Sequence, residues 1–276
     1  MIRAPAADDP DPADPADHSR TESPTGLPDR YPFNLPVFQQ LNHLEFSAPV
    51  TLFTGENGSG KSTLIELVAA ATDAVVIGGE SFRSDKSLSW AMEARSHVRC
   101  AWNKRTHRGF FLRAEDFYNF ARKIKQQMEE MEADAREFDG KFHGTGRILA
   151  VGAMNGQKRA MQSRYGDDLH HLSHGESFLR VFQERFVPGG LYILDEPEAP
   201  LSPTRQLTLL SMILQMVTAG GQFIIATHSP ILMACPHAII LSFDGSPPAP
   251  IAYEDTEHVS VTRAFLNHPE SFLRHL

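Results

Sequence analysis

The segment GENGSGKS, residues 55–62, decides the fold of this chain. It follows the short apolar run VTLF and leads into KSTLIELVAAA, residues 61–71, which has the composition of a helix. In a glycine-rich loop between a strand and a helix, backbone N–H groups converge on phosphate oxygens, and the helix N-terminus adds a partial positive charge. The spacing G-x-x-x-x-G-K-[ST] therefore predicts a site for a nucleoside triphosphate.

Each polar residue of this loop has an expected role. Lys61 reaches the β- and γ-phosphates, the Ser62 hydroxyl coordinates Mg²⁺, and Thr63 adds a contact to the α-phosphate. The predicted nucleotide-binding residues are Gly55, Glu56, Asn57, Gly58, Ser59, Gly60, Lys61, Ser62 and Thr63.

Two later apolar runs end in polar residues that suit phosphate chemistry. LYILDEP, residues 191–197, delivers Asp195 to the C-terminal end of a buried strand, where ligands bind in open α/β sheets. Asp195 fits a Mg²⁺ partner, held directly or through water, and Glu196 fits a base that polarises the attacking water. QFIIATHSP, residues 222–230, places His228 at a similar strand end, where it is a candidate sensor of the γ-phosphate. Alone, such a histidine would more often be structural.

Strand and helix patterns alternate along the chain. Strands are expected at 35–46, 49–55, 74–79, 109–115, 191–197, 222–230 and 237–243, and helices at 61–71 and 202–221. Ser202 and Pro203 form a good helix start, and Gly220 with Gly221 a good stop. The pattern predicts an α/β fold with a mostly parallel central sheet flanked by helices.

Composition excludes several classes of protein. The chain has 276 residues, is 41% hydrophobic, and contains no apolar run near the roughly 20 residues that span a bilayer. No basic-then-apolar signal opens it, so we expect a cytoplasmic protein without direct membrane insertion. Its two cysteines, Cys100 and Cys235, lie far apart and suggest neither a disulfide framework nor zinc. A net charge of −8 disfavours strong nonspecific nucleic-acid binding by the whole chain.

The chain divides into a tail and one folded domain. Residues 1–29 are rich in Ala, Asp and Pro and are expected to be disordered, and residues 30–276 form a single domain with a helical lobe inserted at about 113–180. Within that lobe, one long amphipathic helix is predicted, with a stripe more typical of core packing than of partner docking. The stripe consists of Phe117, Phe120, Ile124, Met128, Met131 and Phe138.

The stretch LSHGES, residues 172–177, is consistent with a helix cap. Ser173 can cap the helix and Glu176 stands three residues later, as in a capping box, before an apolar run. The same stretch also has a second interpretation, as part of a nucleotide site.

In chain order, GENGSGKST, LSHGES, LYILDEP, EAPLSP and ATHSP resemble the ABC-type ATPase domain over about residues 35–245. The likeness is greater to the soluble branch of SMC- and RecF-like proteins than to transporter subunits, since Glu176 stands where transporters usually carry glutamine. The resemblance implies ATP as the nucleotide and its hydrolysis to ADP and phosphate. It also implies an ATP-dependent head-to-tail homodimer in which Ser173 and Gly175 contact ATP bound to the other subunit, with Leu201 and Ser202 near the D-loop.

Some positions depart from that family pattern. His174 stands where glycine is usual, and the Q-loop glutamine is missing, so Glu115 is the candidate for its place. Tyr31 or Phe33 could stack on adenine. The partner would be an effector protein or nucleic acid. The alternatives are the nucleotide-binding subunit of an ABC transporter and a monomeric P-loop kinase, which would leave the signature stretch and the histidine strand unexplained.

Overall fold

The computed structural model describes residues 2–3, 30–77, 82, 85–116, 126, 130, 133, 156 and 174–274. The strands are β1 (Ile2–Arg3), β2 (His43–Leu44), β3 (Val50–Thr54), β4 (Arg99–Cys100), β5 (Gly109–Arg113), β6 (Leu191–Asp195), β7 (Gln222–Ala226), β8 (Ile239–Ser242) and β9 (Ala249–Pro250). The α-helices are α1 (Pro36–Gln40), α2 (Lys61–Ala71), α3 (Ser89–Ala94), α6 (His174–Arg185), α7 (Pro203–Thr218), α8 (Pro230–Met233), α9 (Glu257–Asn267) and α10 (Pro269–Leu273). Two short 3-10 turns, η1 (Arg95–His97) and η2 (Tyr253–Asp255), complete the set.

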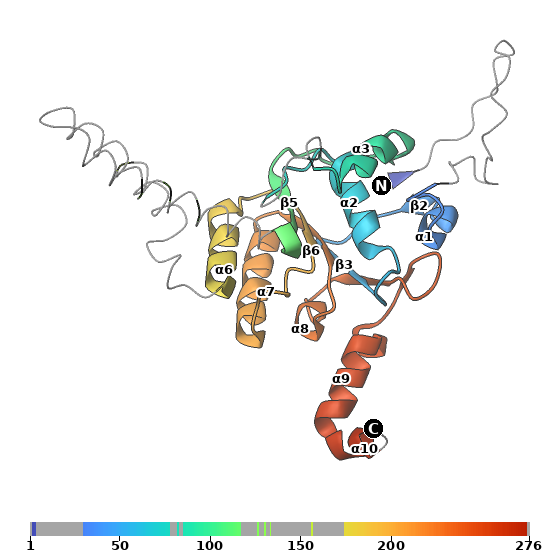
Figure 1. Ribbon diagram of the computed structural model, residues 1–276, viewed down its shortest axis with the longest axis vertical. Coiled ribbons are helices and arrows are strands. Elements are labelled where there is room, and N and C mark those ends of the chain that lie inside the picture. The colour runs from blue at the N-terminus through green and yellow to red at the C-terminus, as the bar shows by residue number, and fades with distance from the viewer. Residues whose placement is uncertain are drawn as a thin grey trace, which may run out of the picture.

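The centre of the molecule is a six-stranded sheet with the order β5-β6-β7-β3-β8-β9. All neighbours from β5 to β8 pair in parallel, and only the short edge strand β9 runs antiparallel. Helices lie on both sides of the sheet (Figure 1). The expected α/β fold with a mostly parallel sheet is therefore confirmed. A separate antiparallel sheet has the order β2-β1-β4.

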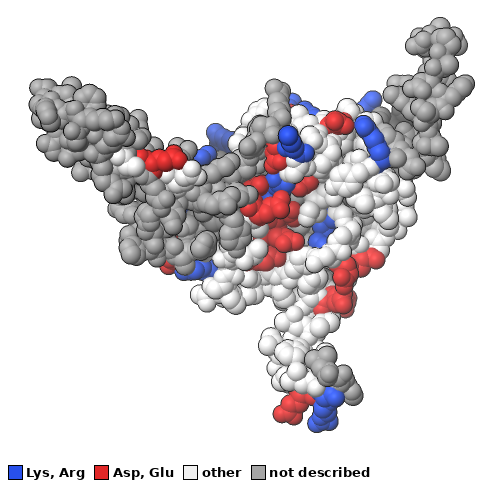
Figure 2. Space-filling model, in the orientation of Figure 1, with Lys and Arg blue, Asp and Glu red and all other residues white. Residues whose placement is uncertain are grey.

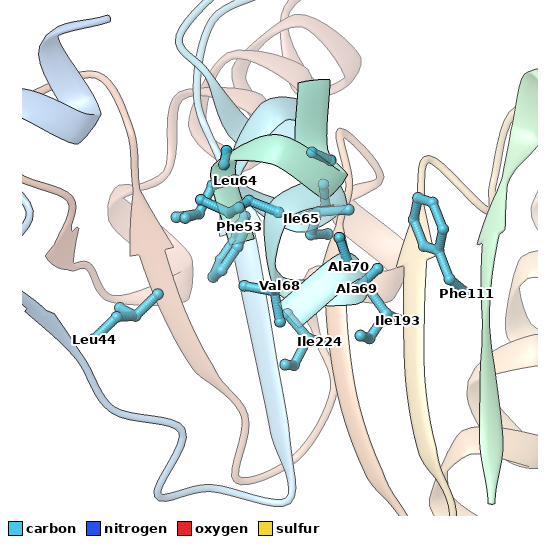
Figure 3. Packing of buried hydrophobic residues seen from close by; sticks show 14 of the residues in the cluster. Leu44, Phe53, Leu64, Ile65, Val68, Ala69, Ala70, Phe111, Ile193 and Ile224 are labelled. Atoms are coloured by element: carbon cyan, nitrogen blue, oxygen red, sulfur yellow. The ribbon is translucent and has the colours of Figure 1, made fainter. Parts of the chain in front are cut away.

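Both faces of the central sheet are buried, because successive side chains of a strand point to opposite faces. Phe53, Ile193 and Ile224 pack on one face against α2 and α3, as Figure 3 shows for the α2 contacts. Their neighbours in sequence, Leu52 and Leu194, pack on the other face, where α6, α7 and α8 contribute the cover. Burial on both faces explains why these strands are continuous apolar runs with no polar alternation.

Two expected strands differ from the structure. Residues 35–46 form helix α1 followed by the two-residue strand β2, because Pro36 occupies the first helical position, where its fixed φ favours a helical turn. Residues 74–79 contribute only one bridge, between Val76 and Phe111. Helix α7 begins at Pro203 as expected, although the Ser202 side chain makes no capping hydrogen bond, and it ends before Gly220.

Parts of the expected organisation lie outside the described residues. These are most of the tail over 1–29, the amphipathic stripe from Phe117 to Phe138, and most of the lobe over 113–180. Ile2 and Arg3 of the expected tail form β1 in the small sheet. No helix in the described part of the chain is long and apolar enough to cross a membrane.

Candidate nucleotide-binding site

The predicted phosphate loop and acidic strand end meet at the C-terminal edge of the sheet. Strands β6, β7 and β3 are neighbours and run in parallel, so the segments that follow them emerge side by side. A pocket of about 270 Å³ lies at this edge. It is lined by Tyr31, Leu35, Asn57, Gly58, Gly60, Lys61, Ser62, Thr63 and Glu196.

The loop has the backbone conformation that its glycines allow. Gly58 and Gly60 have φ angles of 83° and 95°, in the left-handed region, and Gly60 has no side chain to cap α2. The amino end of α2 is therefore available to an anion. Gly55 has a φ of 138°, and a Cβ there would lie 2.9 Å from Asp244 Oδ1, so this position also requires glycine.

Asp244 is a site residue that sequence reasoning missed. Its Oδ1 accepts the backbone N–H of Glu56 at 2.9 Å, and its Oδ2 accepts the Ser242 hydroxyl at 2.8 Å. These bonds hold the start of the phosphate loop against the end of β8. The available signal was a polar residue directly after an apolar strand, the same signal that selected Asp195.

Lys61 is buried and folds back over its own loop. Its Nζ donates to the carbonyl oxygens of Gly55 at 2.6 Å and Glu56 at 2.8 Å. Burial lowers the pKa of Lys61, while the carboxylates of Glu196 and Asp195 oppose that shift. The ammonium group is thus held within the loop by carbonyl groups that it can exchange for phosphate oxygens.

Ser62 and Asp195 meet as the two motifs predict. The Ser62 hydroxyl donates to Asp195 Oδ1 at 3.2 Å, and burial raises the pKa of Asp195 to about 7. A hydroxyl and a carboxylate oxygen at this spacing suit Mg²⁺, which is usually held by one or two protein ligands with water and phosphates. The described residues contain no cluster of three or more His, Cys, Asp or Glu side chains that could hold a metal alone. The donor set therefore fits a metal ion that arrives with a nucleotide.

Glu196 directly follows Asp195 and has a different orientation. Its φ is 50°, uncommon for a residue with a side chain, and its N–H donates to the Ala226 carbonyl at 2.9 Å. Its carboxylate is 44% exposed, lines the pocket, and places Oε1 3.6 Å from His228 Nε2. The backbone turn thus aims one acid at Ser62 and the next at the pocket.

His228 lies at the end of β7 beside this base. Its backbone N–H donates to Glu198 Oε1 at 2.6 Å, and its Nδ1 lies 2.7 Å from His258 Nε2. Burial lowers the pKa of His228, and Lys61 and His258 lower it further. His258 comes from α9, far along the chain, and no motif in the sequence indicated it.

The candidates for adenine stacking and for the Q-loop position, Tyr31, Phe33 and Glu115, lie in different environments. Tyr31 lines the pocket and its hydroxyl lies 3.2 Å from Thr63 Oγ1, whereas Phe33 is buried in the core and cannot face a ligand there. Glu115 is 73% exposed and pairs with Arg113 at 3.2 Å.

Arg113 ends β5 in register with Asp195 and is almost completely buried. It donates from Nε and Nη2 to Asp116 at 2.7 and 2.9 Å, and from Nη2 to Asp85 at 2.9 Å. Its Nη1 contacts Glu66 at 3.2 Å. One guanidinium thus joins α2, the 85–87 turn and Asp116.

The surface also carries acidic groups. Figure 2 shows a band of acidic side chains, with basic ones among them, on the viewed face.

Glu66 is the member of the Arg113 cluster whose charged form is destabilised by burial. Burial raises its pKa to about 7, against the opposing attraction of Arg113. The unfolded-state pKa is near 4.3, so the folded state binds an extra proton between about pH 4 and pH 7. The contribution of Glu66 to stability is therefore fully present below about pH 4 and is lost as the pH rises to about 7. Glu66→Gln should match the wild type at about pH 4 and exceed it at pH 8 by on the order of 2 kcal/mol, measured by urea unfolding.

The matched control for that substitution is Glu115→Gln. Glu115 contacts the same Nη1 atom at the same 3.2 Å, but its side chain is 73% exposed whereas that of Glu66 is 13% exposed. An exposed pair contributes little to stability, so this variant should follow the wild type at both pH values. Equal pH profiles for all three proteins would contradict the assignment of the penalty to burial of Glu66.

The signature stretch is only partly described. Ser173 lies outside the described residues, and α6 begins at His174. Gly175 is buried, and a Cβ there would lie 2.9 Å from both the Pro200 carbonyl oxygen and Arg205 Nη1. Glu176 Oε1 pairs with Arg205 Nη2 at 3.0 Å. The start of α6 is thus packed against the turn that precedes α7 and against the first residues of α7. This packing explains, within one subunit, why position 175 requires glycine.

Two family models match the chain. One described as "AAA domain" matches residues 34–127, and one described as "AAA domain, putative AbiEii toxin, Type IV TA system" matches residues 178–234. The first range contains the phosphate loop, and the second contains Asp195, Glu196 and His228. A comparison with curated proteins found no match. The two matches support a P-loop ATPase family and indicate an ATPase-type enzyme in general.

Proposed function

We propose that the chain binds ATP with Mg²⁺ and hydrolyses it to ADP and phosphate, as an ABC-type ATPase. One observation carries the proposal: at three neighbouring strand ends, Lys61, Ser62 and Glu196 line one pocket. Asp195 contacts Ser62 from behind, and His228 lies beside Glu196. A P-loop alone would serve a kinase equally well. The acid and histidine beside it suit attack by water.

We assign each residue of the site a role in ATP binding or hydrolysis that its position supports. The loop N–H groups from Gly55 to Thr63 and the Lys61 ammonium bind the phosphates, and Tyr31 stacks on the base. Ser62 and Asp195 would hold Mg²⁺, which neutralises charge on the phosphates when bound. The Glu196 carboxylate accepts a proton from the attacking water, and His228 Nε2 donates to the γ-phosphate.

We also propose that two copies of the chain form a head-to-tail dimer. The pocket is open in one subunit, since Glu196 is 44% and Tyr31 49% exposed. A second copy that presents Ser173, Gly175 and the amino end of α6 would cover the phosphates and add a helix dipole. The dimer would act on a partner, and the net charge of −8 with the acidic band of Figure 2 favours an effector protein over nucleic acid.

The description of the second family model names a putative toxin. The matched residues 178–234 hold β6 and β7 with most of α6, all of α7 and α8, which are the centre of the ATPase fold. We therefore infer only an ATPase core from this match.

Lys61→Ala tests the site directly. The substitution removes the ammonium that would meet the β- and γ-phosphates, so ATP should bind at least about tenfold more weakly and phosphate release should fall below detection. Fluorescent-nucleotide titration and a phosphate-release assay give the two readouts. Lys104→Ala, an exposed lysine away from the site, is the control. Lys61 also donates hydrogen bonds within its own loop, so its loss could destabilise the fold. Thermal unfolding of both variants is therefore measured as well, to separate loss of binding from loss of folding. A wild-type protein without Mg²⁺-dependent ATP hydrolysis would overturn the proposal.

A further inference from the structure

Helix α9 places a second histidine beside His228. His258 is the second residue of α9, and its Nε2 lies 2.7 Å from His228 Nδ1 with ring centroids 4.8 Å apart. On its other side, His258 Nδ1 lies 3.5 Å from the hydroxyl of Thr54, the last residue of β3. The two rings therefore connect α9 to the ends of both β7 and β3. In Figure 1, α9 extends away from the sheet below α8, and its first turn is the part nearest the strands.

The nitrogen of His228 that points away from His258 lies against Glu196, which lines the nucleotide pocket. His228 Nε2 is buried, has no hydrogen-bond partner among the described residues, and lies 3.6 Å from Glu196 Oε1. A buried polar nitrogen without a partner costs free energy unless a ligand fills the position. To donate to a phosphate oxygen, this nitrogen must carry a proton.

A proton on His228 Nε2 sets the direction of the whole hydrogen-bond chain. In a neutral imidazole one nitrogen donates and the other accepts, so His228 with a proton on Nε2 must accept through Nδ1. His258 must then donate from Nε2 and accept through Nδ1, for which the Thr54 hydroxyl is the available donor. One consistent direction runs from Thr54 through His258 and His228 to the pocket.

We propose that His258 is a positioning residue that holds His228 in the tautomer and ring orientation with Nε2–H directed at the γ-phosphate of bound ATP. The inference rests on the proposed function of the same site and adds to it a contribution from α9. The C-terminal helix is thereby coupled to hydrolysis, because any movement of its first turn displaces the ring that orients His228.

Burial favours the neutral ring of His228 over the charged one. Lys61, Glu56 and Glu196 face His228, Glu198 accepts its backbone N–H, and Asp244 lies near His258. Burial and the Lys61 ammonium lower the pKa of His228, so the neutral form that the hydrogen-bond chain requires is the one present at neutral pH.

Three variants of the full chain test this assignment. His258→Ala should lower kcat for ATP hydrolysis by on the order of 10- to 100-fold with KM changed by less than about threefold, since ATP binding stays intact while His228 loses its fixed tautomer and ring orientation. His258→Gln keeps an N–H donor near the position of Nε2 and should recover kcat to within about threefold of the wild type. His268→Ala, at the exposed end of the same helix, should match the wild type.

A spectroscopic readout separates positioning from folding. Long-range ¹H–¹⁵N NMR of the imidazole nitrogens should show His228 with its proton on Nε2 in the wild type and a mixture of tautomers in His258→Ala. Equal kcat in His258→Ala and wild type, or an unchanged His228 tautomer, overturns the role of His258 and leaves the ATPase proposal standing. A wild-type chain without Mg-ATP hydrolysis overturns the proposed function, and the tautomer experiment still decides whether His258 orients His228.

Discussion

Replacing Glu196 by glutamine is expected to lower kcat for ATP hydrolysis by about 10³-fold while ATP still binds. The amide keeps the size and shape of the side chain but cannot accept the proton of the attacking water. Lys61, Ser62 and Asp195, which would bind the phosphates and Mg²⁺, are unchanged. Phosphate release and fluorescent-nucleotide titration measure the two effects. Glu270→Gln, an exposed acid on α10, is the control and should change neither.

The trapped state should also change the assembly. With Mg-ATP, Glu196→Gln should elute from gel filtration as a dimer, because ATP that is not hydrolysed keeps both copies closed around it. Without nucleotide it should elute as the wild-type protein does without nucleotide. A variant that binds ATP tightly and stays monomeric would contradict the head-to-tail arrangement.

Ser173→Arg in the Glu196→Gln background identifies the surface that closes. A bulky cation at the signature stretch should abolish the dimer and spare ATP binding to the monomer. If circular dichroism instead shows loss of helix, Ser173 acts chiefly as the cap of α6.

The strand and helix positions that the sequence predicted best are those with two independent constraints. Helix α2 begins at Lys61 and ends at Ala71, as expected, because a glycine loop sets its start and a continuous apolar face covers the sheet. Strand β6 ends at Asp195 because the apolar run stops there. The expected strand over residues 35–46 is wrong because short apolar clusters fit a strand and a helix alike. The helix-start preference of Pro36 decides the local structure.

The contacts that Asp244 and His258 make could not be read from the sequence, because they depend on tertiary structure. Asp244 and His258 lie far along the chain from the residues they contact, Glu56 and His228. No local spacing links those pairs. Glu176 fits a capping box by its spacing, and its carboxylate also pairs with Arg205 of α7, a partner that the packing of α6 against α7 supplies. Local patterns predict the phosphate-binding residues, and the fold supplies the groups that contact them.

Gly109→Ala is expected to destabilise the fold more than any other single-methyl addition considered. Gly109 opens β5 with a φ of 108°, and a Cβ there would lie 1.8 Å from the Leu191 carbonyl oxygen and 2.6 Å from the Leu191 nitrogen. Those atoms belong to the neighbouring strand β6, and Gly109 pairs directly with Leu191. Backbone cannot yield as a side chain does, so the first β5–β6 pair must open.

We expect a loss of about 4 kcal/mol or more in the free energy of unfolding, or failure to fold, because overlap with backbone adds to the cost of the left-handed conformation. Gly189→Ala is the matched control, since its φ is 69° and an added Cβ meets nothing within 4 Å. It should cost only the conformational term, roughly 1–2 kcal/mol. Urea unfolding of both variants measures the difference, which isolates the clash from the strain. Equal losses in the two variants would show that the close approach of β5 to β6 does not decide the requirement for glycine at position 109.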